Sequence, residues 1–255
     1  MVEITIEKLI SLTGELKDNS PSSEKFRSFI SSPDVSRSDL NAWINECLEK
    51  AGQSFNQALQ DMVNCIGERL GFKVDYGRYE RSKDLIEYDG KWVSEEANVQ
   101  LVVETEKTEA YRINPDQFGG YTEELRKKAS INTEELRKIK VPEMYKRIRR
   151  AYGLFVIGEE EPTTLISTIR GSRYRDTIRV IPVKSLLNLF RMKEEIPLSH
   201  AQIVKLLLPI DAINVGEVIE TIEDIIETRL KEEKIETPTK ARVHEGKKEE
   251  DLPTD

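Results

Sequence analysis

Apolar residues in the first part of the chain recur at helical spacing. Ser36 and Asp39 stand three residues apart, a capping pair that predicts the start of a helix. The apolar positions of that helix follow at steps of three and four: Leu40, Trp43, Ile44, Cys47 and Leu48. A longer helix then ends at Gly71, and its apolar face is formed by Phe55, Ala58, Leu59, Met62, Val63, Ile66 and Leu70. The chain is therefore predicted to open with helices.

After Gly71 the apolar period changes to two, which predicts strands. Three strands are predicted at 72–79, 85–92 and 98–108, with Asp89-Gly90 as a hairpin or bulge signal in the second. Further along, strands are predicted at 153–158 and 177–183, and helices at 122–129, 143–152, 184–192, Ser199–Leu208 and 216–230. This order of elements predicts an α/β fold with a mixed sheet of about five strands.

The predicted elements divide the chain into four parts. An N-terminal helical region covers 1–50, the α/β core covers 51–192, a C-terminal helical region covers 193–230, and a charged tail with few apolar residues covers 231–255. The composition of the tail predicts disorder. The isoleucine stripe of the helix at 216–230 has two interpretations, an intramolecular core face or the seam of a homodimer.

Composition narrows the possible chemistry. None of the apolar runs approaches the ~20 residues that a membrane-spanning helix needs, and the N-terminus lacks the pattern of a signal peptide, so we expect a cytoplasmic protein without membrane association. Cys47 and Cys65 have no Cys or His partner at metal spacing and are predicted to be buried free thiols. His200 and His244 lie far from each other and from the charged strand that ends near Lys107. Catalysis in this chain would therefore depend on carboxylates.

Charge is distributed unevenly along the chain. The formal net charge is −8, which by itself disfavours binding to nucleic acid. From Arg126 to Lys184, however, 15 Lys or Arg residues stand against 7 Asp or Glu residues. Such a local excess is typical either of a nucleic-acid-binding surface or of ordinary solvated helix faces.

The end of the third predicted strand carries the candidate chemistry. Side chains alternate along a strand, so Glu104 and Glu106 are predicted to share one face, while Thr105 and Lys107 share the other. Asp89, on the preceding antiparallel strand, is predicted to lie beside Glu104. Three converging acids favour a hard divalent cation, Mg²⁺ or Mn²⁺. The alternative interpretation makes Asp89 a turn residue and the two glutamates a solvated strand face.

These segments resemble a known family in their order along the chain. The runs QDMVNCIGERLGF, DGKW, VVETEKTEAYRI and IRGSR are similar to those of restriction-endonuclease-like proteins in the PD-(D/E)XK nuclease superfamily, over roughly residues 55–190. The resemblance implies a core of a helix, a mixed sheet and flanking helices, here with helical additions at both ends. It implies that Asp89 and Glu104 are metal ligands, and that Asp61 matches the acid that many members carry on the preceding helix.

The sequence departs from the family at one catalytic position. The family usually has Lys two residues after the second acid, where this chain has Glu106. In a first interpretation, Glu106 replaces that Lys, holding a second metal ion or accepting a proton from the attacking water. In a second, a bulge at 105–106 turns Lys107 into the site.

The resemblance implies a Mg²⁺-dependent endonuclease that cleaves DNA to give 5′-phosphate products, of restriction or anti-phage type. Two alternatives remain: a degenerate nuclease fold that binds DNA or a partner without cutting, and a scaffold module that acts through the C-terminal helix.

Two basic segments are candidates for binding the DNA. The predicted loop 169–176 places Arg170, Arg173 and Arg175 before a strand, a suitable arrangement for phosphate contacts. The predicted helix at 143–152 carries the second candidate set: Lys146, Arg147, Arg149 and Arg150. For either set the alternative is a solubilising surface patch.

Overall fold

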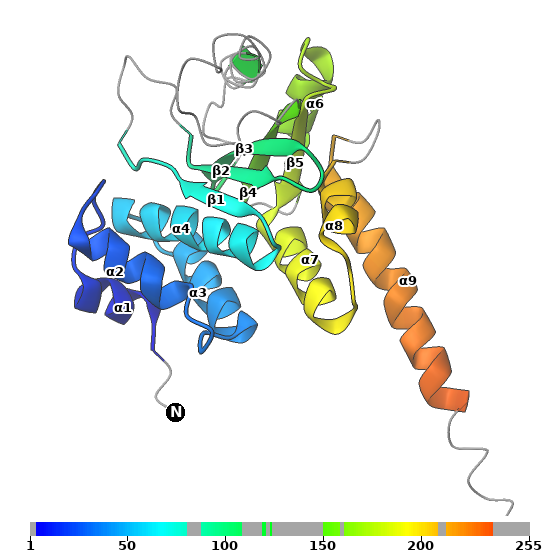
Figure 1. The fold of residues 1–255 in the computed structure, drawn as a ribbon, viewed down its shortest axis with the longest axis horizontal. Coiled ribbons are helices and arrows are strands. Elements are labelled where there is room, and N and C mark those ends of the chain that lie inside the picture. The colour runs from blue at the N-terminus through cyan, green and yellow to red at the C-terminus, as the bar shows by residue number, and fades with distance from the viewer. Residues whose placement is uncertain are drawn as a thin grey trace, which may run out of the picture.

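The computed structural model describes residues 4–80, 88–108, 119–120, 123, 150–158, 161–208 and 213–236, with the backbone alone for 228–236. Its centre is a five-stranded sheet in the order β1-β2-β3-β4-β5 (Figure 1). The strands are β1 Lys73–Tyr76, β2 Gly90–Ser94, β3 Val99–Glu106, β4 Arg150–Ile157 and β5 Ile178–Pro182. β1, β2 and β3 pair antiparallel, whereas β3, β4 and β5 pair parallel. The predicted mixed sheet is confirmed.

Four helices precede the sheet in the chain. They are α1 Ile6–Thr13, α2 Pro21–Ile30, α3 Arg37–Glu49 and α4 Gln53–Arg69. The predicted capping box of α3 is present, since Ser36 and Asp39 each accept a hydrogen bond from the other's backbone N–H. α4 lies directly against one face of the sheet, and α1 to α3 lie beyond it (Figure 1). The N-terminal helices and α4 share one apolar core with that face of the sheet.

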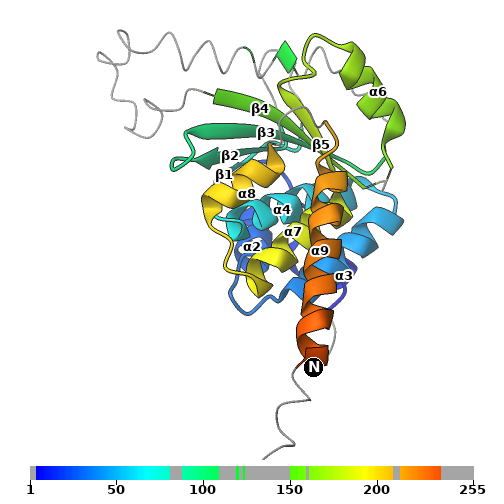
Figure 2. The same ribbon diagram turned by 90° about the vertical axis from the view of Figure 1, so that its right-hand side faces the viewer.

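The remaining described helices cover both faces of the sheet. α6 Thr163–Gly171 lies on the face opposite α4, while α7 Val183–Glu195, α8 His200–Leu207 and α9 Val215–Glu236 lie on the α4 side or beside it (Figure 2). A second, smaller apolar cluster fills the space under α6. Because the parallel strands are covered on both faces, β4 and β5 are almost continuously apolar in sequence.

The strand register leaves the end of β3 open on one side. β2 begins at Gly90, which pairs with Val103, so the last three residues of β3 extend past β2. On the other side β3 pairs with β4 without interruption from Val99 to Glu106. The open end of β3 therefore carries the acids that the sequence singles out.

Four sequence predictions need correction. Asp89-Gly90 is not a turn, because Gly90 is already the first paired residue of β2. Residues 150–152 belong to β4 rather than to a helix, because pairing with β3 satisfies their backbone. The segment 163–171 forms α6, whose β-branched residues have modest helix propensity and obscured the pattern. α9 continues through 231–236, a Glu- and Lys-rich run with good helix propensity.

Some predictions lie outside the described residues. The helix at 122–129 is described only at Glu123, which is helical, and 143–149 and the tail beyond Glu236 are not described. Within the described residues, none of the helices has the length and apolar character to cross a membrane.

Candidate active site at the end of strand β3

Asp89 is held against the open end of β3. Its backbone N–H donates to the carbonyl of Val103 at 3.1 Å, and its carboxylate Oδ2 accepts the backbone N–H of Thr105 at 2.7 Å. The carboxylate thus takes the acceptor position that a continuing β2 would have filled. This contact places Asp89 at Thr105, one residue beyond the Glu104 beside which the antiparallel pairing predicted it.

A cavity of about 280 Å³ opens beside this contact. It is lined by Gln53, Asn56, Gln57, Leu59, Gln60, Tyr79, Asp89, Thr105, Glu106, Lys107 and Thr108. Three of the four predicted catalytic residues therefore border one space: Asp89, Glu106 and Lys107. One wall is formed by the start of α4, and the other by the end of β3.

Glu104 lies behind this cavity rather than on its wall. The residue is only 6 % exposed, and its Cα partner in β4 is Phe155. Val102 belongs to the apolar cluster under α6 and Val103 to the cluster on the α4 side, so alternation places Glu104 on the α6 side of the sheet. A carboxylate this deep in the sheet is not the solvated strand face of the alternative interpretation.

Lys107 reaches the cavity without the predicted bulge. The parallel register of β3 with β4 is continuous from Val99 to Glu106, which excludes a bulge at 105–106. Lys107 follows the last residue of the strand, and its Nζ donates to the backbone carbonyl of Lys50 at 2.6 Å. Burial lowers the pKa of Lys107. The cavity therefore combines the Asp89 carboxylate with one partly desolvated ammonium group, and Glu106 borders it from a strand position that shares the face of Glu104.

Amide side chains of α4 fix the backbone at Asp89. Gln60 Nε2 donates to the Asp89 carbonyl at 3.1 Å and to the Arg78 carbonyl at 3.3 Å, and Asn64 Nδ2 donates to the Asp89 carbonyl at 2.8 Å. Asn64 Oδ1 in turn accepts the indole N–H of Trp92 at 2.9 Å. These amides hold the acid-bearing residue in place.

The close approach of Asn64 explains why a glycine follows Asp89. A Cβ built on Gly90 would lie 1.9 Å from Asn64 Oδ1. Gly90 is thus required by the close approach of α4 to β2, not by a turn. Sequence reasoning had no signal for this role, because Asp-Gly is typical of turns.

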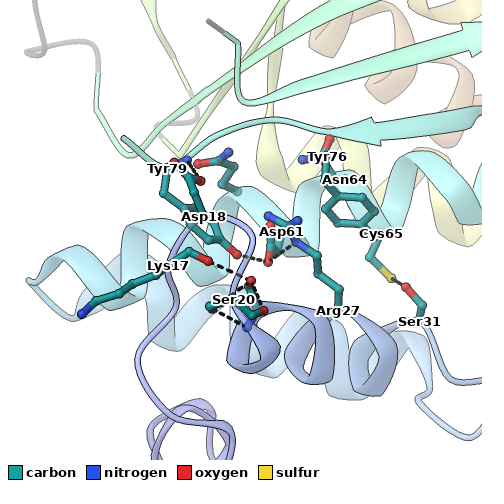
Figure 3. A network of polar contacts seen from close by, with 12 residues as sticks. Lys17, Asp18, Ser20, Arg27, Ser31, Asp61, Asn64, Cys65, Tyr76 and Tyr79 are labelled. Atoms are coloured by element: carbon teal, nitrogen blue, oxygen red, sulfur yellow. Dashed lines mark hydrogen bonds and ion pairs between the residues drawn. The ribbon is translucent and has the colours of Figure 1, made fainter. Parts of the chain in front are cut away.

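Asp61 is directed away from the cavity. The residue is fully buried, and Oδ2 accepts hydrogen bonds from Arg27 Nε at 3.0 Å and from the Tyr79 hydroxyl (Figure 3). The Arg27 guanidinium lies over the rings of Tyr76 and Tyr79, 4.7 and 5.1 Å from their centroids. Burial raises the pKa of Asp61 to about 6, although Arg27 and Tyr79 oppose the shift. The structure therefore joins Asp61 to α2, and not to Asp89 and Glu104.

Sequence reasoning missed the side chains of α4 that do reach the cavity. Gln53, Gln57, Gln60 and Asn64 recur at steps of three and four and so mark one helix face. That face borders the apolar stripe, so its amides have the same pattern as the ordinary polar edge of an amphipathic helix.

The predicted phosphate-binding arginines separate into two environments. Arg170 and Arg175 line a second cavity of about 210 Å³ together with Asp176, Arg179 and Ile213. Arg170 belongs to the last turn of α6 and not to a loop. Arg173 instead lies over the ring of Tyr174, 4.7 Å from its centroid, and donates to the hydroxyl of that residue.

Arg179 and Arg150 complete the described basic positions near the sheet. Arg179, in β5, is buried and donates Nη1 to the carbonyls of Arg175 at 3.2 Å and Ile178 at 2.9 Å. Arg150 begins β4 and not a helix, and its Nη2 donates to the Ala97 carbonyl at 3.2 Å. Lys146 and Arg147 lie outside the described residues.

The side chains around the cavity include oxygen atoms that could bind a divalent cation. Among the described residues no group of three or more Asp, Glu, His or Cys side chains surrounds a single point. The cavity itself offers the Asp89 carboxylate together with amide oxygens, and Glu106 stands at its border. Mg²⁺ is commonly held by one or two carboxylates and keeps several waters, so this all-oxygen set fits an open magnesium site.

The chain thus has an α/β fold with a mixed five-stranded sheet. Among solved structures, the restriction endonuclease FokI is similar, with a TM-score of 0.44 and 16% sequence identity over 74% of this chain. The match spans 34% of the FokI chain, about a third of its length. No protein-family model and no curated protein matches the sequence.

Proposed function

We propose that this chain is a metal-dependent endonuclease that hydrolyses phosphodiester bonds in DNA. The observation that carries the proposal is the convergence of Asp89, Glu106 and Lys107 on one cavity of about 280 Å³ at the end of β3. Two of these residues stand at the motif positions that the sequence resemblance marks as catalytic. The proposal includes DNA as substrate and a restriction or anti-phage role.

The residues that would hold Mg²⁺ or Mn²⁺ are Asp89 and Glu106. The buried Glu104, two positions before Glu106 in β3, adds negative charge. When bound, such a cation supplies Lewis acidity at the phosphate and lowers the pKa of water toward neutrality. Glu106, at the cavity wall, accepts the proton of the attacking water. Lys107, with its lowered pKa, provides positive charge or a proton for the departing oxygen.

Substrate binding involves positive charge outside the cavity. Arg170 and Arg175, with the buried Arg179, line a basic cavity of their own. Contacts from such arginines to DNA phosphates fix position without reading sequence. A homodimer is part of the proposal, and α9, where Ile225 is 54% exposed, is the candidate surface.

Cleavage assays test the proposal directly. Purified protein is incubated with plasmid and phage DNA in Mg²⁺, Mn²⁺ or EDTA, beside Asp89→Ala and Glu104→Gln variants. We expect metal-dependent cleavage that falls by at least about a hundredfold in Asp89→Ala, because removing a ligand costs more than removing its outer partners, and by a smaller factor in Glu104→Gln, which removes a charge behind the cavity. Full activity in both variants would overturn the assignment. An Arg173→Gln variant serves as a control, because this arginine is engaged by Tyr174.

A second function is favoured by the partners of two cavity residues. The Asp89 carboxylate already accepts the Thr105 N–H, and Lys107 already donates to the Lys50 carbonyl. Both contacts suit a nuclease fold that has lost cleavage and binds DNA or a protein partner. DNA binding in EDTA without cleavage in any metal would support this alternative over the first.

A further inference from the structure

The first turn of α4 borders the candidate active site without a cap. Gly52 is the N-cap residue and makes no side-chain cap hydrogen bond. Its φ of 133° lies in a region that L side chains rarely adopt, so a capping Ser or Asp is disfavoured there. In an α-helix the first N–H groups, here those of Gln53, Ser54 and Phe55, have no intrahelical partner. The positive end of a 17-residue helix therefore lies at the cavity wall, where Gln53 and Asn56 line the space.

Gln57 supplies a second and independent observation. The residue is only 7 % exposed and lines the cavity. Among the described residues it makes no hydrogen bond, whereas its neighbour Gln60 donates to two carbonyls. The polar atoms of Gln57 are not among the buried side-chain atoms that lack a partner, so the amide reaches the space of the cavity. An amide that faces a cavity from an otherwise buried side chain, without a protein partner, is placed to hydrogen-bond a ligand there.

The charges around the cavity indicate the sign of that ligand. The α4 wall presents four amide side chains and the apolar Leu59, while Asp89 lies on the opposite wall and Glu106 at its edge. Lys107 adds a positive charge between them. An anion is thus favoured near α4, and a cation is favoured near the carboxylate. Both fit within one cavity of about 280 Å³. A phosphate group contacts both walls when a cation is shared between them.

We propose that the first turn of α4 and the Gln57 amide bind a non-bridging oxygen of a DNA phosphate in this cavity. The inference rests on the proposed function for the identity of the ligand, a phosphodiester group. It assigns Gln57 as a phosphate-binding residue, with the N–H groups of Gln53, Ser54 and Phe55 as further donors. Gln57 donates through Nε2, and its Oε1 accepts from ordered water or from Lys107.

Binding experiments in EDTA test this inference without cleavage. The affinity for a short DNA duplex is measured by calorimetry for the wild type, Gln57→Leu and Gln57→Glu. Asn41→Leu is the matched control, since it removes an exposed amide from α3 outside the cavity. We expect Gln57→Leu to weaken binding about tenfold, the effect of one hydrogen bond to a charged group. Gln57→Glu weakens it further through repulsion, and Asn41→Leu binds as the wild type does.

Two further probes identify the ligand chemistry. Inorganic phosphate, added to ¹⁵N-labelled protein, is expected to shift the backbone amide signals of Gln53, Ser54 and Phe55 and the side-chain amide of Gln57. A duplex with neutral methylphosphonate linkages is expected to bind as weakly to the wild type as the normal duplex binds to Gln57→Leu. Thermal unfolding of each variant verifies that the fold is retained.

The outcomes separate this inference from the proposed function. Unchanged DNA affinity in both Gln57 variants, or unshifted first-turn amides in phosphate, would overturn the inference even if the wild type cleaves DNA with Mg²⁺. Gln57-dependent phosphate binding in a protein that cleaves nothing would support the inference and overturn the nuclease assignment.

Discussion

The polar side chains of α4 that face α2 and those that face the cavity differ in their hydrogen-bond partners. Toward α2, Asp61 is fully buried; its Oδ2 accepts from Arg27 and from the Tyr79 hydroxyl, while its Oδ1 has no hydrogen-bond partner among the described residues. Toward the sheet, Gln57 lies at a cavity and makes no hydrogen bond among the described residues, and Gln60 is only partly engaged. One face holds the helix in the fold, and the other is open to a ligand.

This difference shows why a titratable residue on a helix is a weak indicator of a site. Residues 57, 60, 61 and 64 fall within two turns, and a step of one residue rotates the side chain by about 100°. Asp61 has the chemistry expected of a metal ligand and is turned by only about 40° from Gln57, but its carboxylate is held by Arg27 of α2 and by the Tyr79 hydroxyl. Gln57 carries an uncharged amide, which is a less obvious ligand-binding group, but its side chain lines the cavity.

The largest expected effect comes from removing the acid on the closed face. Asp61→Ala leaves the Arg27 guanidinium, 22 % exposed, without its carboxylate, and we expect a loss of about 4 kcal/mol in the free energy of unfolding. Urea denaturation measures the loss. The double variant Arg27→Met with Asp61→Leu is expected to recover most of it. If the folded Asp61→Ala protein instead lost affinity for Mg²⁺, Asp61 would belong to the site and the contrast between the faces would fail.

A pH series examines the same face. Burial raises the pKa of Asp61 from 3.8 to about 6; Arg27 and Tyr79 oppose the shift and Asp18 adds to it. Because the folded state holds this proton more tightly than the unfolded state, the stability due to Asp61 is complete below about pH 4 and is lost as the pH rises through 6. The change amounts to roughly 3 kcal/mol. Asp61→Asn lacks the titrating group, so the stability of the wild type relative to this variant should fall across that window. A constant difference from pH 4 to pH 7 would refute the shift.

The sequence predicted the sheet and most helices because burial imposes a regular period on each element. The apolar stripe of α4 and the alternation along β3 are examples. It could not predict the burial of Glu104, which depends on β4 and α6 covering β3 from elements some fifty residues or more away in the chain. Nor could it predict the partner of Asp61, because Arg27 arrives from α2 and nothing local marks the pair.

The contact between α4 and β2 gives the next largest effect. In Gly90→Ala the added methyl group would meet Asn64 Oδ1 at 1.9 Å, so Asn64 has to move and its bonds to Asp89 and Trp92 weaken. We expect a loss of about 1–3 kcal/mol in the free energy of unfolding, typical of overpacking. Calorimetric melting measures it, and Gly171→Ala is the control, because open space surrounds that position. If Gly90→Ala were as stable as the control, the close approach would not be what requires glycine.

The smallest effects test the open face itself. Gln60→Leu removes two hydrogen bonds, but the Asp89 carbonyl keeps the donors Asn64 and Gly77 and Arg78 is exposed, so we expect a loss of about 1 kcal/mol. Gln57→Leu replaces an amide without a partner, and we expect a change of less than about 0.5 kcal/mol, or a slight gain, because apolar surface is easier to bury. Parallel urea titrations compare the two variants. Equal losses would mean that Gln57 contributes to the fold as Gln60 does, and the reason to regard it as a ligand-binding residue would disappear. If only Gln60→Leu lowered the free energy of unfolding, Gln57 would contribute nothing to folding, which supports a role in binding.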